Sequence, residues 1–177
     1  MRKLFRALVG IVLLSSPALA QKMGSINRNA PSVATTITFG GKQSIELSYI
    51  AISWGEGNWA KAIAEKNTQM RDSINAQAGK QPLGSLTLPA DMMLGGKQVM
   101  AGKYKLAFTL SEAFAWELTL TGDKDKHTWP LTLEDADKEL KRLTLGLIAG
   151  EADLSATLHI AFGTKRGEVA IGGTQTN

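Results

Sequence analysis

The side chains best suited to binding a ligand surround a glycine-rich stretch, SWGEGNW, at residues 53–59. Trp54 and Trp59 could stack on a sugar or another flat ligand, because an indole ring combines an apolar face with a polar N–H. Glu56 and Asn58 would add a carboxylate and an amide that hydrogen-bond the same ligand. These four residues are the candidate ligand-binding site. In the competing interpretation Trp59 anchors a helix and Trp54 closes the core, since aromatic residues dominate cores.

Residue patterns typical of catalysis are sparse. The sequence has no cysteine, which excludes thiol catalysis, iron–sulfur clusters and thiolate zinc sites. It also lacks the G-x-S-x-G and H-E-x-x-H motifs of hydrolases. Its two histidines, His127 and His159, would have to converge with a carboxylate to hold a metal ion. His159 lies between Leu158 and Ile160, so we expect it on the polar face of a strand. No catalytic residue, metal or cofactor is assigned.

Two acidic stretches could suggest calcium. GDKDK contains Asp123 and Asp125, and EDADKE contains Glu134, Asp135 and Asp137. Calcium needs six to eight oxygen ligands, and neither stretch is a complete binding loop. GDKDK therefore predicts a solvated hairpin turn, and EDADKE predicts a short helical turn.

The N-terminus has the three parts of a secretory signal peptide. Basic residues begin it, residues 7–14 are apolar, and Ala18-Leu19-Ala20 forms an A-x-A cleavage site. Residues 1–20 are therefore predicted to be removed after Ala20, leaving a periplasmic or secreted protein. The apolar run is shorter than the roughly 20 residues of a membrane span, and no later segment is apolar enough. Because a lipobox requires a cysteine and the sequence has none, we expect no lipid anchor.

Charge argues against a nucleic-acid partner. Three of the 20 basic residues and none of the 16 acidic ones lie in residues 1–20. The mature chain would therefore have 17 basic and 16 acidic residues. No concentrated basic stripe remains to follow a phosphate backbone. A glycan, a peptide or an envelope protein is the expected kind of partner.

Alternation of apolar and polar residues predicts a mainly β fold. After a flexible leader at residues 21–32, the pattern indicates a strand, a turn at Gly40-Gly41 and a second strand. Residues 58–79 indicate one inserted helix, with Asn58 as N-cap and Gly79 as its stop. We expect an antiparallel β-sandwich or barrel-like body of about 8–10 strands in a single domain, residues 33–177. The remaining strands are expected around residues 85–88, 104–110, 116–120, 129–133, 143–147 and 158–162, with a last turn at 164–167 before 169–171.

The stretch GGKQVMAGKYKLAFTL, residues 95–110, is interpreted as a hairpin framework and not as an active site. Gly95, Gly96 and Gly102 would supply the positive φ that tight turns require. Tyr104, Leu106 and Phe108 should pack inward while the lysines between them face water. Trp116 and Trp129 follow the same alternation and are expected in the core.

Three stretches together resemble a bacterial exported family catalogued as domain of unknown function 2911. They are ATTITFGGKQSIELSY, LGGKQVMAGKYKLAF followed by AWELTL, and ATLHIAFGTKRGEVAI, which extend from Ala34 to Ile171. The resemblance implies an exported β-rich domain without implying a particular activity. Family members often carry a W-R-x-G-A-N-like segment before the central hairpin. Residues 79–93, GKQPLGSLTLPADMM, lack its tryptophan, arginine and asparagine.

The sequence therefore favours a non-catalytic binding or interaction module of the bacterial envelope. The alternative is a hydrolase acting on envelope material, which would bring His127 or His159 together with two carboxylates. Paired carboxylates for glycoside hydrolysis depend on spatial geometry and stay open.

Overall fold

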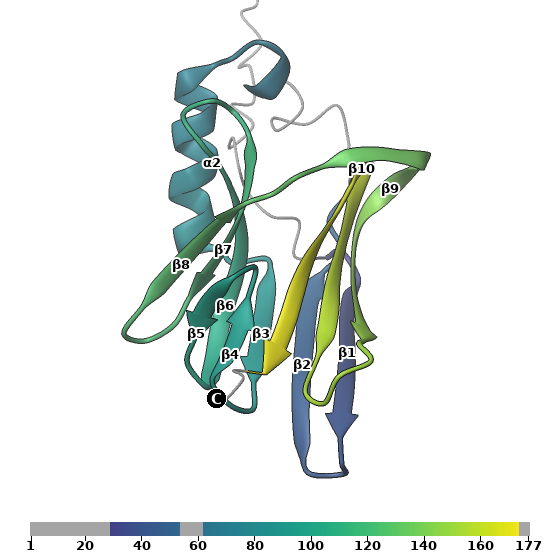
Figure 1. Ribbon diagram of the computed structural model, residues 1–177. Coiled ribbons are helices and arrows are strands. Elements are labelled where there is room, and N and C mark those ends of the chain that lie inside the picture. Colours follow the sequence, from purple (N-terminus) through teal and green to yellow (C-terminus); the bar gives the residue numbers. More distant parts are fainter. Residues whose placement is uncertain (1–28, 54–61, 174–177) are drawn as a thin grey trace, which may run out of the picture.

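The protein folds as two antiparallel β-sheets with a helix beside one of them (Figure 1). The computed structural model describes residues 29–53 and 62–173. The six-stranded sheet has the order β1 (Ser32–Phe39), β2 (Gln43–Ile50), β3 (Gly84–Leu88), β6 (Gly102–Leu110), β7 (Trp116–Thr121) and β8 (Lys126–Pro130). The four-stranded sheet has the order β5 (Lys97–Val99), β4 (Met92–Leu94), β10 (Ala156–Gly173) and β9 (Glu134–Ala149). The predicted mainly β, antiparallel sandwich-like body is confirmed.

The inward faces of the two sheets form one hydrophobic core. Tyr104, Leu106 and Phe108 of β6 are buried as the alternation predicts, while Lys103 and Lys105 are exposed. The predictions for the two tryptophans of this region are also confirmed, since Trp116 is 9% exposed and Trp129 is 4% exposed. Aromatic contacts join the sheets: the Trp116 ring meets Phe108 of β6 and Phe162 of β10 edge-on, with centroids 6.1 Å apart in each pair.

Glycines form the two tight hairpins that the sequence indicates. Gly40 and Gly41 have φ of 53° and 72° between β1 and β2, and Gly95 and Gly96 have φ of 52° and 79° between β4 and β5. These are left-handed conformations that residues with a side chain rarely adopt. Gly95 has a second reason to be glycine, because a Cβ there would lie 2.8 Å from Cδ1 of Trp129.

The helix begins later than the sequence suggests. Helix α2 spans Thr68–Lys80, and its N-cap is Asn67, whose Oδ1 accepts a 3.0 Å hydrogen bond from the N–H of Met70. Lys66, with φ of 47°, separates α2 from a helical turn at residues 62–64. One continuous helix was therefore the wrong prediction. Asn58 lies outside the described residues, and the helix runs through Gly79 to Lys80.

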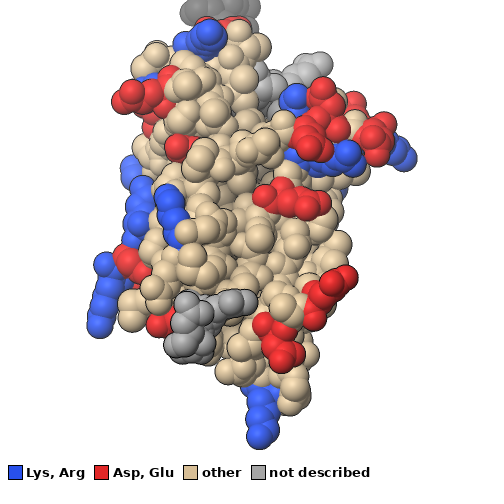
Figure 2. All heavy atoms as spheres, in the orientation of Figure 1, with Lys and Arg blue, Asp and Glu red and all other residues tan. Residues whose placement is uncertain are grey.

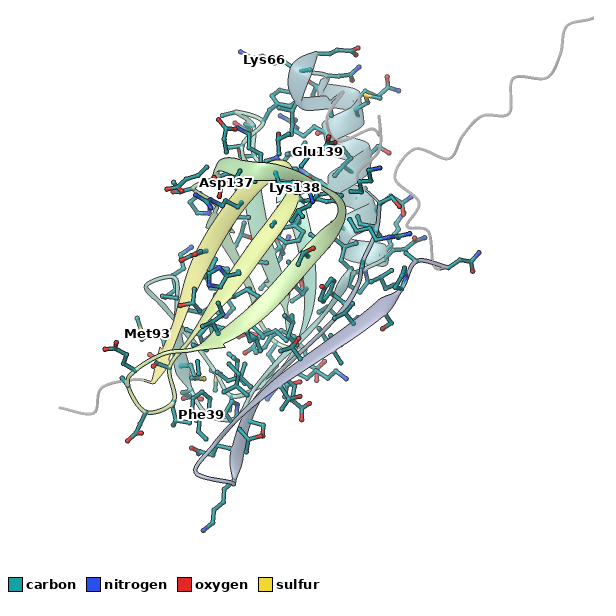
Figure 3. All side chains as sticks on the ribbon, turned by 90° about the vertical axis from the view of Figure 1, so that its right-hand side faces the viewer. Phe39, Lys66, Met93, Asp137, Lys138 and Glu139 are labelled. Atoms are coloured by element: carbon teal, nitrogen blue, oxygen red, sulfur yellow. The ribbon has the colours of Figure 1, made fainter. Side chains whose placement is uncertain are left out.

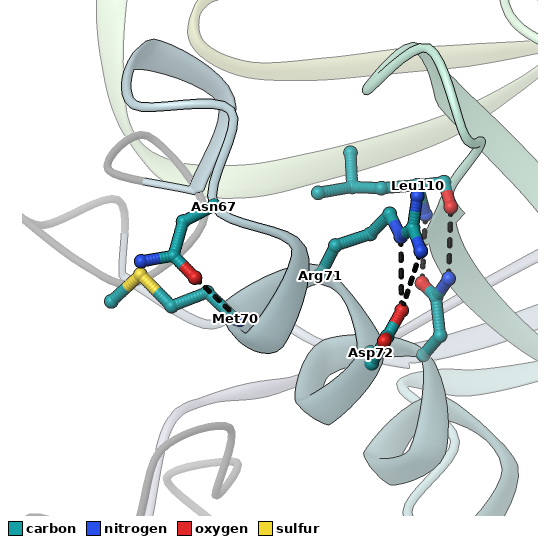
Figure 4. Close-up of polar contacts among 6 residues, drawn as sticks. Asn67, Met70, Arg71, Asp72 and Leu110 are labelled. Atoms are coloured by element: carbon teal, nitrogen blue, oxygen red, sulfur yellow. Dashed lines mark hydrogen bonds and ion pairs between the residues drawn. The ribbon is translucent and has the colours of Figure 1, made fainter.

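Helix α2 is attached to the end of β6 through a side-chain amide (Figure 4). Asn75 donates to the carbonyl oxygen of Leu110 and accepts from its N–H, each at 2.8 Å. The amide thereby satisfies both backbone groups of that residue, as a neighbouring strand would. Met70 and Ile74 of α2 are buried in the core.

The predicted helical turn at EDADKE is wrong, because these residues begin β9. Glu134 and Asp135 pair in register with Arg166 and Lys165 of β10, and Lys165 Nζ lies 2.6 Å from Asp135 Oδ1. Cross-strand partners of opposite charge favour an extended conformation here.

The predicted turn at residues 164–167 lies within β10, which folds back on itself (Figure 1). His159 Nδ1 is 3.0 Å from Glu168 Oε1, although nine residues of straight strand would span about 30 Å. The reversal lies near Gly163, which has φ of 63°.

The two sheets are also tied together by polar contacts on both open sides. On one side the N–H of Leu143 in β9 donates to the carbonyl of Ile52 at 2.9 Å. On the other side Lys97 Nζ donates to the carbonyl of Thr128 in β8 at 2.7 Å. In the two described ranges, no helix is long and apolar enough to cross a membrane.

Candidate functional site

The aromatic site predicted from the sequence falls outside the described residues. Trp54, Glu56, Asn58 and Trp59 all lie in the gap at 54–61, so their arrangement stays a prediction. On either side of this gap, Ser53 forms a β-bridge with Arg142 of β9, and Ala62 is fully buried. Residues 1–20, the predicted signal peptide, are likewise outside the described part.

One polar cluster does form, around His127 on β8. His127 Nε2 lies 2.9 Å from Asp125 Oδ2, and the hydroxyl of Tyr104 is 3.2 Å from the same oxygen and 3.0 Å from the carbonyl of Met100. The His127 ring stacks on Trp129, with centroids 5.6 Å apart and an angle of 24° between the planes.

Electrostatics in this cluster favour the ionised carboxylate. The hydrogen bond from His127 is the largest influence holding the pKa of Asp125 below its usual range, and the hydrogen bond from Tyr104 acts in the same direction. The pKa of Tyr104 is raised, first by burial and then by its hydrogen bond to Asp125. The phenol therefore stays protonated and donates to its acceptors.

This cluster is built to hold turns together. Tyr104 is 3% exposed, so its hydroxyl has little access to a substrate. Through that hydroxyl it joins the β7–β8 turn, which contains Asp125, to the chain at Met100 before β6. We interpret the network as a latch between two turns.

The second histidine belongs to a different surface. His159 lies on β10 of the four-stranded sheet and pairs with Glu168 at 3.0 Å, with both side chains partly exposed. No three His, Asp or Glu side chains in the described ranges are arranged to hold a metal ion.

Both acidic stretches are engaged in other contacts. Asp125 belongs to the latch. Lys165 and Arg166 of β10 lie between 2.6 and 3.8 Å from carboxylates at the start of β9, namely Glu134, Asp135 and Asp137. Figure 2 shows acidic and basic side chains mixed at the upper right corner of the molecule, where β9 begins. Figure 3 labels Asp137, Lys138 and Glu139 in this region. Neighbouring charges of opposite sign make this corner a network of exposed ion pairs.

The feature that stands out is the free edge of β1. Within the described part of the chain β1 pairs with β2 alone, over all eight of its residues. Its sequence, SVATTITF, contains no charged residue and no proline. Figure 3 is turned toward this side of the molecule, with Phe39 labelled at the end of the strand. Long, uncharged edge strands are the usual place where another strand adds to a sheet.

The direction of the free backbone groups follows from two hydrogen bonds. Ala51 continues the β1–β2 register and donates to the carbonyl of Pro31 at 2.8 Å, whereas Ile50 donates away from β1, to Leu83 at 2.8 Å. Antiparallel pairs alternate between bonded and non-bonded residues. Four residues of β1 therefore direct their N–H and C=O groups away from β2: Ser32, Ala34, Thr36 and Thr38.

The core-facing side of β1 is incompletely covered. Val33, Ile37 and Phe39 pack against the core but stay partly exposed, whereas Ile45 and Leu47 on the neighbouring β2 are 0% and 1% exposed. One further strand beside β1 would cover this row. The sequence carried a signal for this edge, the absence of charge and proline from residues 32–39, but not the order of strands in the sheet.

Comparison with protein-family models, with curated proteins and with solved structures finds no match for this chain. The resemblance to domain of unknown function 2911 therefore stays a prediction.

Proposed function

We propose that this protein is a non-catalytic interaction module of the bacterial envelope, which binds a partner by strand addition at β1. The observation that carries the proposal is the free edge of β1, with four residues whose backbone groups point outward and a partly exposed apolar row beside them. Strand addition draws its affinity from main-chain hydrogen bonds and its specificity from alternate side chains.

The location in the envelope rests on the sequence alone. The predicted signal peptide places the mature chain in the periplasm or outside the cell, where it would meet glycans, peptides and other envelope proteins. Among these, the geometry of a strand edge favours a polypeptide, because a glycan offers no regular ladder of N–H and C=O groups.

The proposal is tested by binding of an extended probe peptide. The probe is a fluorescently labelled peptide of alternating threonine and valine, with lysines at both ends for solubility. Saturable binding to the purified protein, measured by fluorescence anisotropy, is expected. Thr36→Pro removes one outward N–H and leaves the bonds to β2 intact, a position where an edge strand tolerates proline.

Thr36→Val is the matched control, because it changes the same side chain and keeps the N–H. Binding should weaken several-fold with Thr36→Pro and stay near the wild-type value with Thr36→Val. Circular dichroism and thermal melting establish that both variants are folded. If the wild type does not bind the probe at a concentration at which it is monomeric, or if both variants bind it equally well, strand addition of a peptide at this edge is refuted.

The alternative, a hydrolase acting on envelope material, has weaker support. The hydrolase hypothesis requires a histidine close to two carboxylates. His127 has one such partner, Asp125. The same carboxylate oxygen also accepts a hydrogen bond from Tyr104, and the cluster links two turns.

A further inference from the structure

We propose that the partner of β1 is β1 of a second copy of this protein, paired antiparallel about a two-fold axis through Thr35. This inference rests on the proposed function, since it names the strand that the edge accepts. It would join two six-stranded sheets into one continuous sheet.

The backbone fixes the register. The outward groups belong to even-numbered residues, so even residues of one copy must face even residues of the other. The register that uses all of them places Ser32 opposite Thr38 of the second copy and Ala34 opposite Thr36 of the second copy. That arrangement makes about eight hydrogen bonds, two for each bonded pair. Thr35 then faces itself across the axis.

The side chains suit self-pairing. With this register Val33 of each copy lies opposite Ile37 of the other, on the side that faces the core. β-branched pairs of this kind stabilise antiparallel sheets. The two apolar side chains are partly exposed in the single chain, and the second strand would cover them. β1 has no charged residue, so two identical strands meet without repulsion.

In the described part of the chain each of the other sheet edges carries a feature against pairing that β1 lacks. In β8, Pro130 lacks an N–H, and Lys97 caps the carbonyl of Thr128 at 2.7 Å. β5 is three residues long. β9 begins with a run of charged residues and donates from Leu143 to the carbonyl of Ile52. Prolines, lysines, charges and short strands are the devices by which proteins prevent unwanted pairing.

Charge variants test the register. In Ala34→Lys/Thr36→Lys, each introduced lysine faces a lysine of the other copy, so the dimer should be lost. In Ala34→Glu/Thr36→Lys, each glutamate faces a lysine, so the dimer should return. The side chains of Ala34 and Thr36 are exposed, so both variants should fold. Thr36→Lys, which both variants contain, places the lysine opposite Glu46 of the same chain, where opposite charges favour the fold.

A disulfide locates the axis. The protein has no cysteine, so Thr35→Cys introduces a single thiol. Facing residues of a non-bonded pair have Cα atoms about 4.5 Å apart, which is within the range of a disulfide. Under mild oxidation Thr35→Cys should yield a covalent dimer on non-reducing gels. Thr144→Cys, exposed on β9, is the matched control and should stay mostly monomeric.

Sedimentation velocity over a concentration series supplies the oligomeric state. A reversible wild-type dimer, lost with the two lysines, restored with glutamate and lysine, and trapped by Thr35→Cys, supports the inference. A wild type that stays monomeric at the highest concentration overturns it. So does a dimer that keeps its strength with the two lysines. Probe-peptide binding by a monomeric wild type would leave the proposed function standing while this inference fails.

Discussion

The side-chain amide of Asn75 should contribute measurably to the attachment of helix α2 to the sheet. Asn75→Ala removes two 2.8 Å hydrogen bonds to the backbone of Leu110. At about 1 kcal/mol for each bond, the loss is about 2 kcal/mol. Alanine returns roughly 0.6 kcal/mol through its higher helix propensity. The free energy of unfolding should therefore fall by about 1.5 kcal/mol, which lowers the melting temperature by roughly 3–6 °C for a chain of this size.

Asn75→Asp separates the hydrogen bonds from the size of the side chain. An ionised carboxylate can still accept a hydrogen bond from the N–H of Leu110. Its other oxygen, however, would face the carbonyl oxygen of Leu110 with no proton to donate, because both atoms are acceptors. Only the protonated carboxyl can donate to that oxygen, so the pKa of the introduced group should be raised in the folded protein. Its stabilising form is fully present below the unfolded pKa and is lost as pH rises through the folded pKa.

Urea denaturation at several pH values measures both effects. The stability gap between wild type and Asn75→Asp should narrow as pH falls through the acid range, whereas the gap for Asn75→Ala should stay constant. Unfolding slopes that match the wild type establish that the midpoints report stability. An Asn75→Ala protein within about 0.5 kcal/mol of wild type would refute the assigned role, because that is the usual scatter of surface substitutions.

Three further substitutions test other parts of the fold. Gly95→Ala should cost roughly 1 kcal/mol for its positive φ and a further 1–3 kcal/mol for displacing Trp129, measured by urea denaturation. Asn67→Ala should cost about 1 kcal/mol by removing the N-cap of α2, with a matching loss of helical signal in circular dichroism. Asp125 has a lowered pKa, so its contribution is present above its unfolded pKa and is lost as pH falls through the folded value. The difference in melting temperature between wild type and Asp125→Asn should therefore shrink toward low pH.

The faces of the strands could be predicted from the sequence because alternation is local. Tyr104, Leu106 and Phe108 needed only their own spacing to be assigned to the core, and the turns at Gly40-Gly41 and Gly95-Gly96 needed only their glycines. Burial and positive φ at these positions follow from a few adjacent residues. No knowledge of the partner strand was required.

The errors have long-range or competing causes. The acidic start of β9 is extended because it pairs with Lys165 and Arg166 of β10. These partners lie about thirty residues further along the chain, so the neighbouring sequence does not reveal them. The helix starts at Thr68 because the Asn67 side chain caps it by a hydrogen bond. This cap lies inside the stretch, residues 58–79, for which the sequence predicts a single helix. The importance of β1 depends on its place at the end of the sheet, which is a property of strand order.

The protection of β8 leads to a last prediction. Thr128 and Pro130 occupy positions whose backbone groups point to the free edge, since Leu131 donates to the carbonyl of Trp116 at 2.8 Å and the alternation counts back from there. Proline removes one donor at that edge, and Lys97 occupies one acceptor. Replacing both, in Pro130→Thr/Lys97→Met, should open a second edge on a protein that already pairs through β1. Sedimentation should then reveal species larger than a dimer, and adding Thr36→Pro should reduce them, because growth of the sheet needs both edges. Association that stops at the dimer in Pro130→Thr/Lys97→Met would mean that proline and lysine are not what keeps β8 unpaired.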